Sequence, residues 1–237
     1  MLEHRPFERL GRFDNDWLSA RYHFSFSGYR EQGRDGWGSL LVWNDDRIRS
    51  HTGFPRHPHR DMEIITYIRK GAITHLDHLG NEGRTEAGDV QVMSAGKGIQ
   101  HEEHNREGGD TELFQIWIWP NEQGVKPRWD QRKFPKAERA GQLVALASGQ
   151  KGHEGALQIF QDATIFGATL KTGQRVTHAL GAGRYAYLVP ATGKLLVNGT
   201  TAKARDGVAI RDQTSIDIEA LEDSELLLAD VPPMPAM

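Results

Sequence analysis

Two short clusters of histidine and carboxylate side chains contain the residues best suited to do chemistry. The first holds His57 and His59 on either side of a proline, and the second holds His101 and Glu103. Side chains two residues apart on a β-strand point to the same face of the sheet. If the two segments pair as neighbouring strands, three imidazoles and one carboxylate face the same space. The spacing therefore predicts a site for one metal ion.

Imidazole and carboxylate ligands suit several divalent transition metals. Fe(II), Cu, Ni, Mn, Co and Zn all accept such ligands, and ligand type alone does not choose among them. A four-residue N/O site with room for a substrate is more typical of an open redox centre, so we expect Fe(II) in preference to zinc. The simpler alternative is that these histidines face solvent or pack in the core.

Glu63 competes with Glu103 for the fourth ligand position. It lies four residues after His59, so a straight strand places it about 13 Å further along. Glu103 shares a face with His101 and needs no irregularity to reach the ion. We therefore predict Glu103 as the ligand, and Glu63 only if the strand bends near Asp61; otherwise Glu63 is a carboxylate beside the site or at its rim.

Four further polar residues of this region have less suitable spacing. Glu102 and His104 alternate with the predicted ligands and are expected to face away from the metal. His75 and His78 are three residues apart, which does not bring two side chains together on a strand. We expect them at the surface or beside a ligand.

The strand pattern after the second cluster has a simple structural explanation. Trp117 and Trp119 lie on one face and Ile116 and Ile118 on the other, and core packing accounts for this alternation. The charged residues 128–132 are interpreted as a solvated face, although they could steer an anionic substrate.

The elements that must position the clusters are short strands separated by turns. Examples are residues 22–26, 39–43, 62–68, 72–79, 90–93 and 113–119. Residues 121–140 are polar, contain two prolines and are predicted to be a surface connector. Short strands resume after it, with Asn198-Gly199 typical of a hairpin turn. Turn signals every 8 to 12 residues favour an all-β sandwich or barrel.

The composition narrows the class of protein. The 237 residues are 38% hydrophobic and 26% charged, with a net charge of −3 and no cysteine. The charge offers no basic surface for nucleic acid, and the missing thiols exclude disulfides and thiolate metal sites. No apolar run is long enough to span a bilayer and no signal peptide is visible. We expect a cytoplasmic protein without nucleic-acid or membrane partners.

The two clusters also resemble the two motifs of the cupin family. The first motif is matched by Gly53, His57, His59 and Glu63, and the second by Gly88, Gly98, His101 and Asn105, with Ser94 where proline is common. The strings HFSFSGY, HPHRDMEIITY, GDVQVMSAGKGIQHEEHN and QIWIWP resemble the pirin family specifically. The resemblance covers nearly the whole chain and is close to the bacterial pirin-like quercetin 2,3-dioxygenases.

This resemblance implies a bicupin fold of two tandem cupin, jelly-roll-like β-barrels. Residues 1–135 would form the metal-binding cupin, and residues 136–237 a degenerate cupin that has lost its ligands. Matching the motifs residue by residue gives the ligands His57, His59, His101 and Glu103, the same four that the spacing indicates.

The resemblance further implies a metal-dependent dioxygenase that cleaves a flavonol such as quercetin with O₂ and releases carbon monoxide. Glu103 would be the catalytic base for the substrate's 3-hydroxyl. The resemblance to pirins of higher cells implies a second possible function, that of a metal-binding regulatory protein that acts through a protein partner. A closed structural metal site without catalysis is the third.

Overall fold

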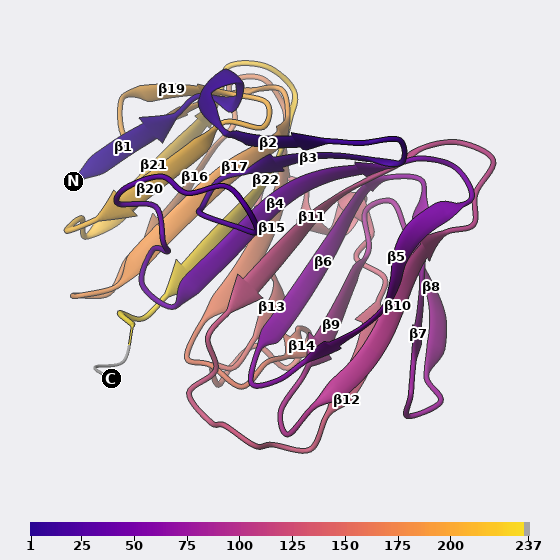
Figure 1. The fold of residues 1–237 in the computed structure, drawn as a ribbon. Coiled ribbons are helices and arrows are strands. Elements are labelled where there is room, and N and C mark those ends of the chain that lie inside the picture. Colours follow the sequence, from indigo (N-terminus) through magenta and orange to yellow (C-terminus); the bar gives the residue numbers. More distant parts are fainter. Residues whose placement is uncertain (235–237) are drawn as a thin grey trace.

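The regular secondary structure is almost entirely β-strand, arranged as two units that each contain a seven-stranded and a four-stranded sheet (Figure 1). The computed structural model describes residues 1–234. In each unit the small sheet faces the large one, so the units are jelly-roll-like pairs of sheets rather than closed barrels. The prediction of an all-β architecture is confirmed.

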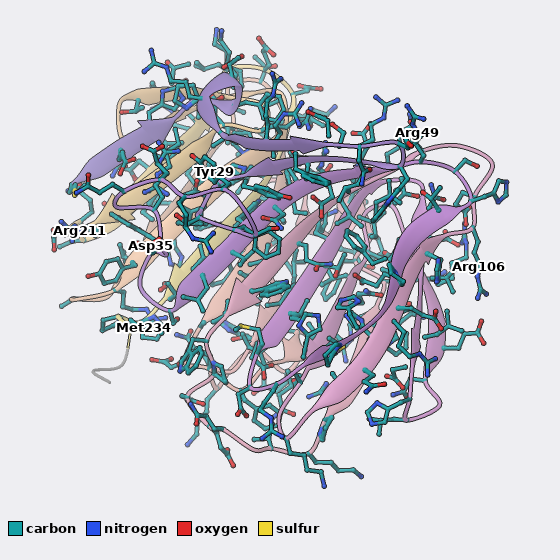
Figure 2. The ribbon with its side chains drawn as sticks, viewed as in Figure 1. Tyr29, Asp35, Arg49, Arg106, Arg211 and Met234 are labelled. Atoms are coloured by element: carbon teal, nitrogen blue, oxygen red, sulfur yellow. The ribbon has the colours of Figure 1, made fainter. Side chains whose placement is uncertain are left out.

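The first unit supplies both histidine clusters. Its large sheet has the order β12 (Arg128–Arg132), β9 (Val90–Ser94), β6 (Glu63–Lys70), β11 (Thr111–Ile118), β4 (Leu40–Ile48), β3 (Leu18–Tyr22) and β2 (Gly11–Asp14). Its small sheet has the order β5 (Thr52–His59), β10 (Ile99–Asn105), β7 (Ala72–Asp77) and β8 (Glu82–Glu86). Arg49 and Arg106 directly follow β4 and β10, and Figure 2 shows both at the same end of this unit.

The second unit repeats the arrangement. Its large sheet has the order β1 (Leu2–Arg5), β20 (Gly207–Arg211), β17 (Tyr185–Thr192), β22 (Ser224–Val231), β15 (Thr164–Leu170), β13 (Val144–Ser148) and β14 (Leu157–Gln158). Its small sheet has the order β16 (Arg175–Ala179), β21 (Ser215–Ala220), β18 (Lys194–Val197) and β19 (Thr200–Lys203). The predicted Asn198-Gly199 turn joins β18 to β19, and both residues have positive φ, as this hairpin turn requires.

Two segments depart from the order of the chain. Strand β1 pairs with β20, so the first residues of the protein complete the sheet of the second unit. The predicted surface connector is mostly exposed, and it contains β12, which pairs with β9 as an edge strand, and the short 3₁₀ helix η2 (Lys136–Arg139). A second 3₁₀ helix, η1 (Phe7–Arg9), follows β1.

The predicted strand at residues 22–26 is also misplaced. Strand β3 ends at Tyr22, and the chain then leaves the sheet. Phe24 is nevertheless fully buried, because it packs against Tyr187 of the second unit. The alternating aromatic residues of this segment therefore do not share one face of a strand. Tyr22 lies on β3, whereas Phe24 contacts the second unit.

The two large sheets pack against each other and form the main hydrophobic core. Trp43, Ile65 and Phe114 of the first unit lie in one buried cluster with Tyr187 and Leu227 of the second. Both faces of each large sheet are thus covered, one by the other unit and one by its own small sheet. Strands such as β6 and β22 are buried along nearly their whole length for this reason.

The interiors of the two units differ in chemistry. Between the sheets of the second unit lie aliphatic side chains such as Leu188, Val208 and Ile218. The corresponding space in the first unit contains the buried polar residues Gln91 and Glu103 beside the histidines. A polar interior between two sheets is the part of the fold that can do chemistry. Within residues 1–234, no helix is long and apolar enough to cross a membrane.

Candidate metal centre

The two histidine clusters meet on adjacent strands of the small sheet. Strands β5 and β10 pair antiparallel, and His101 lies directly opposite His57. The register then shifts by a β-bulge, so that Glu103 is opposite Phe54. The predicted pairing of the two segments is confirmed, and the same-face argument places the side chains on the interior face of the sheet.

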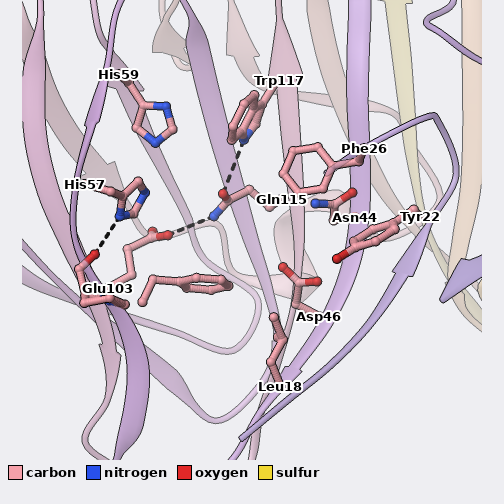
Figure 3. A pocket seen from close by; sticks show the side chains of 12 residues that line it. Leu18, Tyr22, Phe26, Asn44, Asp46, His57, His59, Glu103, Gln115 and Trp117 are labelled. Carbon is pink, nitrogen blue, oxygen red and sulfur yellow. Dashed lines mark hydrogen bonds between the residues drawn. The ribbon is translucent and has the colours of Figure 1, made fainter. Parts of the chain in front are cut away.

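Three imidazoles converge in this space. The ring centroids of His57 and His101 are 4.5 Å apart, and His59 lies 4.8 Å from the first and 5.0 Å from the second. A ligand nitrogen from each of the three lies within 4.8 Å of the others. Figure 3 shows His57 and His59 side by side at one end of a cavity.

The tautomer of His57 is set by the main chain. Its Nδ1 lies 2.7 Å from the carbonyl oxygen of Pro55. A carbonyl oxygen can only accept, so Nδ1 carries the hydrogen and Nε2 of His57 keeps its lone pair. That Nε2 points toward the other imidazoles.

The tautomer of His101 is set by a chain of hydrogen bonds that begins at a carboxylate. Asp77 accepts from Nε2 of His75 at 3.1 Å, so Nδ1 of a neutral His75 is an acceptor. That Nδ1 lies 3.3 Å from Nδ1 of His101, which must then donate. The remaining Nε2 of His101 carries a lone pair. In metalloproteins a carboxylate often fixes the tautomer of a metal-binding histidine directly, and here His75 relays that effect from Asp77 to His101.

The two lone pairs face each other. Nε2 of His57 and Nε2 of His101 are 3.1 Å apart, and Nε2 of His59 is buried without a hydrogen-bond partner in the described part of the chain. Two lone pairs at this distance repel unless a cation lies between them. Two nitrogens bound at right angles to one ion, at about 2.1 Å each, would be about 3 Å apart. The donor set thus fits a transition-metal ion.

The protonation states agree with this fit. Burial, and secondarily the charge that neighbouring imidazoles would carry, lowers the pKa of both His59 and His101 to about 3. Both rings are therefore neutral at physiological pH. A neutral imidazole can bind a metal without first losing a proton.

Glu103 lies beside the histidines but in a different grouping. It is buried, and its two carboxylate oxygens accept hydrogen bonds from the side-chain amides of Gln91 at 2.6 Å and Gln115 at 2.9 Å. Its oxygens lie within 4.8 Å of ligand atoms of His75 and His101, whereas the group around His57 and His59 does not include it. A carboxylate has about four acceptor positions, so lone pairs remain after both amide bonds.

Glu63 lies outside both groups of possible metal ligands. It shares a face of β6 with Ile65 and Tyr67, which pack in the core between the two units. Its carboxyl accepts a hydrogen bond from Ser94, and burial raises its pKa to about 7. The chain does bend near Asp61, where φ is positive, but the bend carries Glu63 into the large sheet, so the residue lies neither beside the site nor at its rim.

His75 lies beside the predicted ligand His101, which is one of the two positions expected for it. It is fully buried and stacks on Trp129 with the ring planes 5° apart. Its partner is Asp77, two residues on, rather than His78, three residues on. The same i, i+2 rule that selected the ligands would have found this pair. Glu102 and His104 bond to each other at 3.2 Å on the opposite face, as predicted.

A cavity of about 280 Å³ adjoins the histidines (Figure 3). Its wall is largely apolar and aromatic, and it ends in polar groups. The lining residues are Leu18, Tyr22, Phe26, Asn44, Asp46, Phe54, Pro55, His57, His59, Glu103, Gln115 and Trp117. Its size is close to the lower end of the range of about 300–1,000 Å³ that small-molecule sites occupy.

Trp117 is part of this wall. Ile116 and Ile118 are buried in the core between the units, as expected. Trp117 points the other way, packs edge-on against His59 at 5.0 Å and donates to Gln115 at 3.3 Å. The interpretation of Trp117 as a core residue is confirmed only in part, because it packs against the buried cluster of Ile64 and Met93 but also lines the cavity.

Two facing-sheet units, with a histidine cluster inside the first and an aliphatic interior in the second, define a bicupin protein with one candidate metal centre. Within residues 1–234, no comparable group of ligands occurs in the second unit. Residues 3–118 match the family model described as Pirin, and residues 145–231 match the model described as Quercetinase C-terminal cupin domain. The chain belongs to the pirin family.

Relatives of this chain cover nearly its whole length. A Pseudomonas aeruginosa protein named "Putative quercetin 2,3-dioxygenase" is 59% identical over 98% of this chain and 100% of its own. An Escherichia coli protein named quercetin 2,3-dioxygenase is 37% identical over 99% and 100%. The crystal structure of the bacterial pirin YhhW from E. coli in complex with nickel(II) has a TM-score of 0.93 and 36% identity, covering 99% of this chain and 100% of that chain.

Proposed function

We propose that this protein is a metal-dependent dioxygenase that cleaves a flavonol such as quercetin with O₂ and releases carbon monoxide. The observation that carries the proposal is the pair of opposed lone pairs on His57 and His101, placed at the end of an apolar cavity. The names of the relatives from P. aeruginosa and E. coli support the same activity.

We propose His57, His59, His101 and Glu103 as the ligands of one divalent transition metal. Fe(II) is the ion we favour, and Cu, Ni, Mn, Co and Zn are compatible with the donor set. The nickel complex of YhhW supports a metal in this family without choosing the ion for this chain. When bound, the metal would lower the pKa of the substrate's 3-hydroxyl and supply redox chemistry toward O₂.

The role proposed for Glu103 is that of the base that takes the proton of the 3-hydroxyl. It lines the cavity, and the amides of Gln91 and Gln115 hold its carboxylate in one orientation. These amide donors also stabilise the negative charge of the Glu103 carboxylate, which must be ionised to take up the proton. The free lone pairs of its oxygens would receive the proton.

The cavity wall would position the substrate. Phe54 and Trp117 bracket the histidine end, and Phe26 packs edge-on against Trp117 at 5.4 Å. Flat aromatic walls suit a flat aromatic ligand and exclude bulk water from the reacting end. We further propose that residues 1–135 carry all the chemistry and that residues 136–237 form a unit without ligands, which the aliphatic interior of that unit supports.

The proposal is tested by loading the metal-free protein under nitrogen with each of the six metals in turn, then admitting O₂ with quercetin and measuring O₂ uptake and carbon monoxide release. We expect O₂ to be consumed and carbon monoxide to be released, each in proportion to the quercetin consumed. Glu103→Gln, compared with wild type at equal metal content, should turn over at least about 100-fold more slowly.

Glu102→Gln is the matched control, because the neighbouring side chain points to the opposite face of β10 and bonds to His104. This variant should retain wild-type turnover. Equal turnover by Glu103→Gln and wild type would contradict the role of base, and a wild type that releases no carbon monoxide with any of the six metals would contradict the proposed activity.

A further inference from the structure

The cavity contains two buried polar side chains that the proposed reaction does not use. Asn44 and Asp46 lie two residues apart on β4 and line the cavity from the large sheet. They are 5% and 3% exposed, and the Oδ1 atom of each has no hydrogen-bond partner among the described residues. Buried polar atoms almost always have a partner, so each exception calls for an explanation.

The neighbouring residue on the same strand shows that the chain can satisfy a buried carboxylate. Asp45 is fully buried on the opposite face of β4 and is paired with Arg69 at 2.6 Å and Arg205 at 2.5 Å. No basic side chain approaches Asp46 in this way within residues 1–234. An unpaired buried acceptor destabilises the folded protein by about 1–3 kcal/mol. A protein keeps such an acceptor more readily where a ligand supplies the missing hydrogen bond.

The pair lies away from the histidines. Figure 3 shows Asn44, Asp46 and the hydroxyl of Tyr22 grouped on the side of the cavity opposite His57 and His59. Gln115, which lies directly across from Asn44 on β11, and several apolar and aromatic side chains line the space between these two ends. A ligand that reaches the histidines with one end can therefore place its other end against Asn44 and Asp46.

We propose that Asn44 and Asp46, with Tyr22 beside them, form a specificity subsite that binds a ring hydroxyl at the far end of a phenolic substrate. An amide oxygen can only accept, and a carboxyl keeps an acceptor oxygen in both protonation states. The complementary group is a ring hydroxyl, which can donate to the carboxyl of Asp46 and accept from the amide nitrogen of Asn44. This inference rests on the proposed function, because it takes the histidine end as the reacting end, and it selects polyhydroxylated flavonols over those without ring hydroxyls.

The test is a binding measurement with two ligands that share the reacting end. Quercetin has further ring hydroxyls, whereas 3-hydroxyflavone has only the hydroxyl at the reacting end. Their dissociation constants are measured by titration calorimetry under nitrogen with the nickel-loaded protein, for wild type, Asp46→Leu, Asn44→Leu and Arg47→Gln. Arg47 is the control, since it directly follows Asp46 on β4 and its exposed side chain pairs with Asp110 instead of lining the cavity.

Asp46→Leu and Asn44→Leu should each weaken quercetin binding by about tenfold, the effect of one lost hydrogen bond, and change 3-hydroxyflavone binding by less than about twofold. Their melting temperatures should equal or exceed that of wild type, because an unsatisfied buried group has been removed. Arg47→Gln should bind both ligands as wild type does. A merely structural role would lower the melting temperature and leave the ratio of the two affinities unchanged.

The subsite is overturned if both ligands weaken equally in the leucine variants, if quercetin binding does not change, or if wild type binds neither ligand. If one leucine variant fails to fold, the other still gives the ratio of the affinities for quercetin and 3-hydroxyflavone. Turnover in air separates this inference from the proposed function: selective binding of quercetin without carbon monoxide release supports the subsite and contradicts the dioxygenase activity.

Discussion

Glu225 holds the two units together through a buried ionic network, and replacing it with alanine should destabilise the whole protein. Its carboxylate accepts hydrogen bonds from Tyr67 of the first unit, from Arg139 at 2.9 Å and from Lys136 at 2.8 Å. Glu225 is 4% exposed and Arg139 is 1% exposed. The alanine variant would leave the Arg139 guanidinium charge buried without a counter-ion.

The size of the effect follows from that burial. Removing one partner of a buried ion pair costs about 3–5 kcal/mol, because the remaining charge stays desolvated. In a protein of this length, 1 kcal/mol corresponds to about 2–4 °C, so the melting temperature should fall by about 6–20 °C. Burial raises the pKa of Tyr67, and the charge of Glu225 raises it further, so this phenol remains a donor throughout the neutral range.

The assay is thermal unfolding followed by calorimetry at neutral pH, with Glu82→Ala as the control. Glu82 pairs with Arg106 at the surface, where the two side chains are 59% and 53% exposed, and such a pair contributes less than about 1 kcal/mol. The double variant Glu225→Leu with Arg139→Met removes both charges and should be closer to wild type than Glu225→Ala is.

A fall of less than about 3 °C for Glu225→Ala would refute this reasoning, since it would mean that the Arg139 charge is hydrated or paired elsewhere. A double variant less stable than Glu225→Ala would also contradict it. In that case the two side chains would contribute by packing and not through their charges.

Two further predictions concern Glu63 and Asp77. Burial raises the pKa of Glu63 to about 7, so its stabilising contribution is complete below about pH 4.5 and is lost as pH rises through 7. Glu63→Gln should therefore gain stability over wild type by up to about 3 kcal/mol between pH 5 and 8, seen as diverging melting temperatures; parallel curves would contradict this. Asp77→Asn should bind Ni(II) about 10- to 100-fold more weakly by competition with a chelator, because His75 loses the acceptor that fixes the tautomer of His101; unchanged affinity would contradict it.

The histidine centre could be predicted because its geometry is local. Each pair of ligands is two residues apart, and the period of a strand fixes their common face without knowledge of the rest of the fold. The prediction of the site assumes that the two segments pair as neighbouring strands, and the pairing of β5 with β10 confirms this assumption. The same rule applied to His75 and Asp77 would have identified the supporting hydrogen bonds, but only histidine partners were sought for His75.

Other features could not be predicted because both faces of the large sheets are buried. On β4 and β11, one face packs against the second unit and the other lines the cavity, so alternation alone does not say which face Trp117 or Asp46 occupies. Pairing of β1 with β20 joins residues about 200 positions apart in sequence, and no local pattern encodes it. Both features depend on how the two units pack.

The most direct test of the proposed centre is a metal titration of the metal-free protein under nitrogen, with carbon monoxide release from quercetin measured at each point after O₂ is admitted. Release should rise linearly and reach a plateau at one ion per chain, and His101→Ala should show neither the tight binding nor the release. Quercetin consumption that is independent of added metal, or that persists in His101→Ala, would contradict the assignment of His57, His59, His101 and Glu103 as a catalytic metal centre.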